Sequence, residues 1–244
     1  GVGATEAWDA LTHGLVAGYS RQRTTMSGMD GRVDADMLHT ALLAGLNRGN
    51  FFIDGAVGYG RSWNDARRSL PYGALGTFSY SSNFRQDMWS ASVGAGYIAD
   101  LPYQLRLVPS ITLDAVWVRT GEMKETGALA SLKMEKSRYT SVELPISLML
   151  EKRVSCSGKA FAPWIEAAWI PELGDCRPAA TMRFTGNSAA GSFRSSAAAA
   201  HSRGRVAAGL RGEVGRVSLN MGYTFEFSRS HSNHILNAGI GMAF

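Results

Sequence analysis

VSLNMGYTFEFS (residues 217–228) and ILNAGIGMAF (residues 235–244) both alternate between apolar side chains and polar or small ones. In the first stretch every odd position from Val217 to Phe227 is apolar, and every even position is polar or glycine. Side chains of a strand point alternately to opposite faces, so this period of two predicts two strands, each with one apolar face. The second stretch continues to Phe244 without a polar tail, and we expect the last strand to need this residue.

Four upstream segments repeat the alternation and predict further strands of the same kind. They are FFIDGAVGYG (51–60), MWSASVGAGY (88–97), QLRLVPSITLDAVWVR (104–119) and SVELPISLML (141–150). No apolar run among the 244 residues approaches the roughly 18–20 residues of a membrane-spanning helix, which excludes a helical membrane protein. A transmembrane β-barrel is not excluded, because its strands carry only a weak signal segment by segment.

The polar face of these segments favours a closed barrel over a soluble β-sandwich, although strands of both alternate. It combines Gly, Ser and Ala with isolated charges, and this composition suits the crowded, wet interior of a barrel. Aromatic residues gather near the strand ends, as they do in the aromatic girdles of membrane barrels. The charged candidates for the lumen are Asp54, Arg106, Asp114, Glu143, Glu166 and Glu226.

The connections between the predicted strands alternate in length. Short ones fall near residues 8–9, 47–50, 99–103, 155–159 and 212–216, and longer ones near 27–33, 66–76, 121–131, 172–200 and 229–233. All the short turns lie at one end if the strands run up and down. This asymmetry predicts an antiparallel barrel with short periplasmic turns and longer extracellular loops.

Three stretches of the chain also resemble a known family. They are LVPSITLDAVWVRTGEMKETG (107–127), APWIEAAWIPELGD (162–175) and GYTFEFSRSHSNHILNAGIGMAF (222–244). In order and spacing they are similar to the C-terminal translocator (β-barrel) domain of autotransporters, the type V secretion proteins of Gram-negative bacteria. Such domains have about twelve strands, preceded by a helix that threads the pore. We count ten full strands, so residues 1–244 are expected to form this domain without its first strand and pore helix.

The resemblance implies a function in the outer membrane without catalysis or a cofactor. The domain is expected to export or display an upstream passenger, in contact with outer-membrane lipid and lipopolysaccharide. In the family, the alternating residues of the last strand form the signal that the barrel assembly machinery reads. The residues at the corresponding positions here are Leu236, Ala238, Ile240, Met242 and Phe244.

Other functions remain as alternatives at this point. One is an independent porin, and another is a barrel enzyme that uses His201, His231 or His234 on the long loops. A metal site at His231 and His234 would lack a third ligand. The lumen acids could cleave a passenger, or they could simply pair with Arg106, Arg205 and Arg211. A soluble β-sandwich adhesion module is the last alternative.

The net charge of +5 does not indicate nucleic-acid binding, because the basic residues are scattered rather than clustered. Arg67 and Arg68, for example, fall in a predicted loop, where we expect solvated charge. Contact with lipopolysaccharide phosphate is the alternative for such residues.

Overall fold

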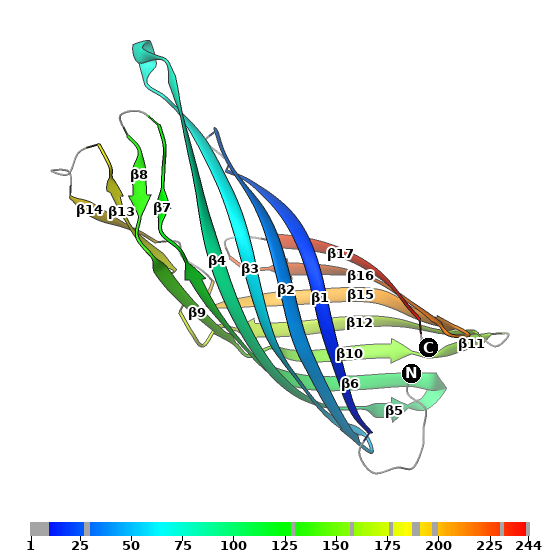
Figure 1. The fold of residues 1–244 in the computed structure, drawn as a ribbon. Helices are drawn as coiled ribbons and strands as arrows, with labels where there is room; N and C mark the ends of the chain where they lie inside the picture. Colours follow the sequence, from blue (N-terminus) through cyan, green and yellow to red (C-terminus); the bar gives the residue numbers. More distant parts are fainter. Residues whose placement is uncertain are drawn as a thin grey trace.

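A computed structural model describes residues 10–26, 30–127, 130–156, 159–175, 178–186, 191–196, 200–229 and 232–242. These residues form a large curled antiparallel sheet with a smaller sheet beside one end of it (Figure 1). No helix among them is long and apolar enough to cross a membrane. The predicted all-β antiparallel fold is therefore confirmed.

The large sheet follows chain order, each main strand pairing with the next one along the sequence. Its main strands are β1 (Ala10–Met26), β2 (Asp30–Arg48), β3 (Phe51–Pro71), β4 (Thr77–Tyr97), β6 (Leu105–Thr120), β10 (Ile146–Lys152), β12 (Lys159–Pro171), β15 (Ser202–Val214), β16 (Val217–Phe227) and β17 (Ser232–Met242). The short strands β5 (Ala99–Leu101) and β9 (Ser137–Glu143) pair with β6, and β11 (Val154–Cys156) pairs with β12. Between the described parts of β1 and β17 the sheet is open, so it forms a half-barrel (Figure 1).

The small sheet is built mainly from the connections that the sequence assigned to long loops, and β8 follows directly after the predicted loop at 121–131. Its order is β14 (Ser192–Ser196), β13 (Ala179–Phe184), β8 (Leu132–Met134) and β7 (Met123–Lys124). It lies beside the tall β3–β4 hairpin (Figure 1). Two short 3-10 helices, η1 (Gly73–Leu75) and η2 (Pro102–Gln104), complete the described elements.

The large sheet has an apolar outer face and almost no conventional core. Leu15, Leu236 and Ile240 are 73%, 80% and 81% exposed. Among the described residues, the buried apolar side chains are few: Tyr80, Val108, Met134, Ile170 and Ala207. A β-sandwich would bury its apolar face against a second sheet. Exposed apolar rows of this extent instead suit a sheet whose outer face meets lipid.

The predicted strand at 141–150 is interrupted at Leu144 and Pro145, which separate β9 from β10. The register does not change, because β6 pairs with both pieces in one alignment, Asp114 opposite Glu143 and Ile111 opposite Ile146. Proline has no N–H to give to the ladder. The carbonyl oxygen of Pro145 still accepts a hydrogen bond from the N–H of Thr112 at 2.9 Å, so the pairing with β6 continues through the interruption.

The predicted boundaries of the long loops were wrong where strands extend beyond the apolar segments. Residues 66–69 were placed in a loop, yet β3 continues to Pro71 with Ala66 opposite Ser82 and Ser69 opposite Ser79. The backbone hydrogen bonds between two strands can continue where the strands are surrounded by water. The alternation of apolar side chains, in contrast, stops where the outer face is no longer in apolar surroundings. The short turns at 47–50 and 212–216 are confirmed and contain Gly49 and Gly215 with φ of 58° and 62°, a left-handed conformation that favours glycine. The predicted turn at 8–9 lies outside the described residues.

Candidate functional site: the polar inner face and its long-loop end

The face opposite the apolar rows is the concave inner face of the half-barrel. Arg211 on β15 forms an ion pair with Glu151 on β10 at 3.1 Å, although β12 lies between these strands. On the concave face of a curled sheet, side chains of strands that are not neighbours come closer together, so they can meet across the strand between them. We therefore call this polar side the inner face and the apolar side the outer face.

All six charged lumen candidates lie on the inner face by their strand register. Asp54 lies on β3, Arg106 and Asp114 on β6, Glu143 on β9, Glu166 on β12 and Glu226 on β16. That this face encloses a lumen remains a prediction.

Arginines of β15 bring three of these carboxylates together. Arg205 donates to Glu166 with nitrogen–oxygen distances of 3.2 and 2.9 Å. Arg203 lies 2.7 Å from Glu143 and 3.8 Å from Glu226. The pairing of Glu166 with Arg205 matches the expectation from the sequence. Arg203 was missed because it lies beside the long loop, where the alternation gives no signal.

The other three candidates do not join this row. Arg106 pairs with Asp100 of β5 at 2.9 Å, and Asp114 accepts a hydrogen bond from the Ser92 hydroxyl at 2.6 Å. Asp54 lies beside Gly94, where an added Cβ would come within 3.0 Å of a carboxylate oxygen. The glycine therefore leaves room for the Asp54 carboxylate between two strands.

An aromatic platform lies near the short-turn end of the inner face. The Trp164 ring covers Gly209 and Gly222, where added Cβ atoms would lie 2.6 and 3.3 Å from it. The Arg211 guanidinium is 5.4 Å from the ring centroid. Trp164, Arg211 and Asn237 line a hollow of about 370 Å³. A wide indole can lie flat here only because the neighbouring positions have no side chain.

Glu172 fixes the start of the long connection after β12, a role that no pattern in the sequence indicated. Its carboxylate accepts hydrogen bonds from the Ser141 hydroxyl and from the backbone N–H groups of Val142 and Gly174, the latter two at 2.8 Å. A carboxylate with several donors is a strong local anchor. It holds the beginning of this connection against β9.

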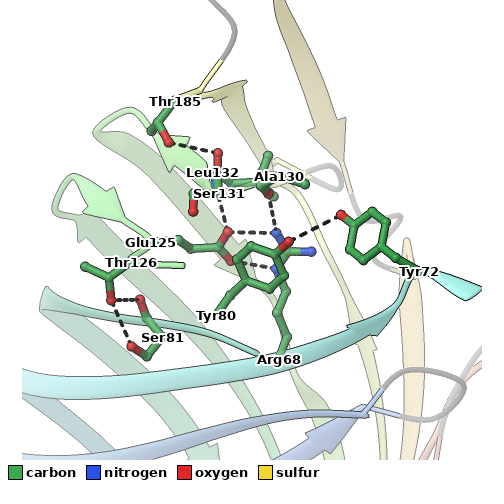
Figure 2. Close-up of polar contacts among 10 residues, drawn as sticks. All are labelled: Arg68, Tyr72, Tyr80, Ser81, Glu125, Thr126, Ala130, Ser131, Leu132 and Thr185. Atoms are coloured by element: carbon green, nitrogen blue, oxygen red, sulfur yellow. Dashed lines mark hydrogen bonds and ion pairs between the residues drawn. The ribbon is translucent and has the colours of Figure 1, made fainter. Parts of the chain in front are cut away.

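A second polar cluster ties the small sheet to the β3–β4 hairpin (Figure 2). Arg68 donates two hydrogen bonds to Glu125, at 2.6 and 2.7 Å, and a third to the carbonyl oxygen of Ala130 at 3.0 Å. Glu125, only 7% exposed, also accepts from the backbone N–H of Leu132 at 2.7 Å. The guanidinium lies 4.5 Å from the ring centroid of Tyr80.

This cluster corrects the prediction of solvated charge at Arg68. The Glu125 carboxylate beside Arg68 holds the pKa of that guanidinium above its usual range. Tyr80 is 1% exposed and its hydroxyl lies 3.3 Å from that of Tyr72. Thr126 and Ser81 add a short bridge between the same two segments (Figure 2). Arg68 is therefore a structural anchor for the loops.

The described residues give no cluster of three His, Cys, Asp or Glu that could hold a metal ion. The Nδ1 atom of His234 lies 2.6 Å from the Tyr223 hydroxyl. His231 lies outside the described residues, so the two-histidine alternative is not tested as a pair.

The five predicted assembly residues fall on or just after β17. Leu236, Ala238 and Ile240 lie on the outer face, opposite Tyr223, Met221 and Leu219 of β16. The backbone of Met242 pairs with that of Val217, and Phe244 lies outside the described residues. Within the described residues, β17 pairs with β16 on one side and has a free edge on the other.

Comparison with known proteins relates this architecture to one family. A family model described as the autotransporter beta-domain matches residues 2–224. The fold is similar to the β domain of the Bordetella autotransporter BrkA, with a TM-score of 0.70 and 17% identity over 99% of this chain and 86% of that one. It is also similar to the translocator domain of the autotransporter NalP from Neisseria meningitidis, with a TM-score of 0.64 and 18% identity over 97% of this chain and 82% of that one. No curated protein matches the sequence.

Proposed function

The chain belongs to the autotransporter β-domain family, and on this premise we propose that it exports or displays a passenger encoded upstream of it, from the outer membrane of a Gram-negative bacterium. The observation that carries the proposal is the two-faced sheet. Its strands expose apolar rows on one side and hold ion-paired charges on the other. A wall of this kind separates lipid from a wet conduit.

The inner face suits the passage of an unfolded segment. Arginines compensate several of its carboxylates, as Arg205 does for Glu166 and Arg211 for Glu151. Paired charges keep the wall hydrated without presenting a strong net field that would hold a passing chain.

The outer row of β17 suits recognition during insertion. We expect the barrel assembly machinery to read Leu236, Ala238, Ile240, Met242 and Phe244. The edge of β17 that is unpaired among the described residues supports this role, since such an edge offers backbone groups for strand addition.

The test uses the full-length protein in Gram-negative cells, with an epitope upstream of Gly1. We expect the epitope to be sensitive to external protease in intact cells, and the barrel to fractionate with the outer membrane and shift in mobility on heating. A periplasmic marker must stay protected in the same cells. A heat-modifiable barrel with ion-selective conductance but no surface epitope would instead identify a porin.

The assembly role is tested separately by deleting Phe244. We expect loss of the folded barrel from the outer membrane, with the unfolded chain accumulating in the periplasm. Unchanged barrel and unchanged display in this variant would refute the assembly role of Phe244, while leaving the translocator function intact.

A further inference from the structure

We propose that the outer face of β3, β4, β6 and β9 binds the phosphate groups of a phosphorylated glycolipid in the surrounding leaflet. The site is formed by Arg61, Arg85, Arg119 and Arg138, which we call the arginine patch. The proposal rests on the outer-membrane location proposed above. To that location the proposal adds a specific lipid-binding site on one side of the barrel.

The patch begins directly beyond a row of aromatic side chains. Tyr59, Trp89 and Trp117 are register partners on β3, β4 and β6. Side chains of this kind mark the level of the membrane interface. The next outer positions toward the long-loop end therefore lie at the level of the lipid headgroups.

Arginines occupy those next positions on neighbouring strands. Arg61 on β3 pairs in register with Asp87 on β4, Asp87 with Arg119 on β6, and Arg119 with Arg138 on β9. Arg85 lies two residues from Asp87 on the same face of β4, opposite Trp63. Neighbouring strands lie about 4.8 Å apart, so the four guanidinium groups can converge on one headgroup.

The patch carries more positive charge than its own carboxylate can compensate. Asp87 accepts hydrogen bonds from Arg61 at 2.7 Å and from the Tyr59 hydroxyl at 2.6 Å. The Arg119 guanidinium lies 5.2 Å from the ring centroid of Trp89 and rests on the aromatic row. All four arginines are exposed. Asp87 is thus the one carboxylate in register with these guanidinium groups, while Asp65 lies further along the same face of β3, opposite Asn83.

The arginines of the neighbouring hairpin carry a smaller excess of positive charge. On β1 and β2, Arg23 and Arg32 both lie 2.7 Å from Asp34, and Arg21 lies 3.6 Å from Asp36. Two carboxylates thus face three guanidinium groups, so one positive charge of the hairpin stays uncompensated. The unmatched charge is therefore concentrated on β3, β4, β6 and β9, beside the aromatic row.

The chemistry of the patch favours a lipid phosphate over other anions. The planar guanidinium fork matches phosphate oxygens and forms strong charge-assisted hydrogen bonds with them. The apolar rows below the patch give the acyl chains of the same molecule a surface, and a water-borne phosphate would gain nothing from them. A glycolipid with phosphorylated sugars meets both requirements.

The test is native mass spectrometry of the full-length protein, purified in detergent and given diphosphoryl lipid A or its dephosphorylated form. The test variant is Arg85→Gln/Arg119→Gln/Arg138→Gln, which keeps Arg61 as the partner of Asp87. The control is Arg21→Gln/Arg23→Gln/Arg32→Gln, which removes the same charge from the β1–β2 hairpin, where each of these three arginines has a carboxylate within 3.6 Å. We expect lipid A to bind the wild type and the control alike, and the test variant about tenfold or more weakly.

Equal weakening in both variants would overturn the proposal, because net charge alone would then explain binding. So would equal binding of the dephosphorylated lipid, or full competition by millimolar inorganic phosphate, which would indicate a phosphate site without lipid selectivity. Epitope display is measured on the same variants. If the test variant loses lipid A binding but still displays the epitope, the lipid site is separate from the translocator function. If the wild type itself fails to display the epitope, the translocator function is refuted.

Discussion

Arg68 and Glu125 form a two-point ion pair, with nitrogen–oxygen distances of 2.6 and 2.7 Å, that joins β3 to a connection 57 residues further along the chain. Both side chains are shielded, with 18% and 7% of their surface exposed. Leu132 of β8 donates its backbone N–H to the same carboxylate. The pair therefore connects the tall β3–β4 hairpin to the small sheet (Figure 2).

Replacement of Glu125 by Gln should release the small sheet from the hairpin. Arg68 would be left half-buried without its counter-charge, and breaking a well-shielded ion pair costs up to about 3 kcal/mol. We expect faster hydrogen exchange at the amides of β8 and β13, measured by mass spectrometry on the folded barrel. Glu122→Gln is the matched control, because its pair with Lys133 is more exposed, and it should leave exchange unchanged. Unchanged exchange in Glu125→Gln would show that the pair does not anchor the sheet.

Replacement of Gly209 by Ala should destabilise the barrel. The new Cβ would lie 2.5 Å from the carbonyl oxygen of Met221 and 2.6 Å from the Trp164 ring. Overpacking of this kind costs about 1–3 kcal/mol. We expect a lower temperature for the heat-induced mobility shift. Gly14→Ala is the control, since its Cβ would have no neighbour closer than 3.9 Å, and a transition temperature lowered equally in both variants would contradict this explanation.

The β1–β2 hairpin should loosen in acid through Asp34. The hydrogen bond from Arg23 holds the pKa of Asp34 below its usual value of 3.8. Because the pKa of Asp34 is lower in the folded state than in the unfolded state, the ionised carboxylate stabilises the hairpin at pH values above the unfolded-state pKa. This contribution is lost as the pH falls through the folded-state pKa. NMR titration of the Asp34 carboxyl carbon should give a midpoint below 3.8 in the wild type and a higher midpoint in Arg23→Gln. Identical midpoints would contradict the assigned cause.

The sequence predicted the parts of the fold that the apolar surroundings dictate. Where an outer face must be apolar, as from Val217 to Phe227, alternation alone identifies the strand and its two faces. Beyond the apolar rows both faces are polar, so the extension of β3 to Pro71 left no pattern to read. The small sheet was missed for the same reason.

The candidate site was predictable residue by residue, but of its ion pairs only Glu166 with Arg205, which joins neighbouring strands, matched a pairing that the sequence suggested. Alternation was enough to assign Glu143 and Glu166 to the inner face. The partner of Glu143 is Arg203, 60 residues away, and this pair depends on the curl of the sheet across β12. The contact of Arg68 with Glu125 likewise depends on how a long connection folds back. Such pairings are set by three-dimensional closure, and one sequence carries no local trace of them.

The two faces of β17 can be compared directly with the neighbours Leu236 and Asn237. Leu236 is 80% exposed on the outer face, while Asn237 borders the hollow beside Trp164 on the inner face. Arginine on the lipid face of a barrel costs about 2–4 kcal/mol near the middle of the membrane, whereas a wet interior tolerates it. Leu236→Arg should therefore lower the folded fraction in urea titrations in detergent and reduce epitope display in cells. Asn237→Arg should retain both, and the opposite order of the two variants would show that the faces are assigned the wrong way round.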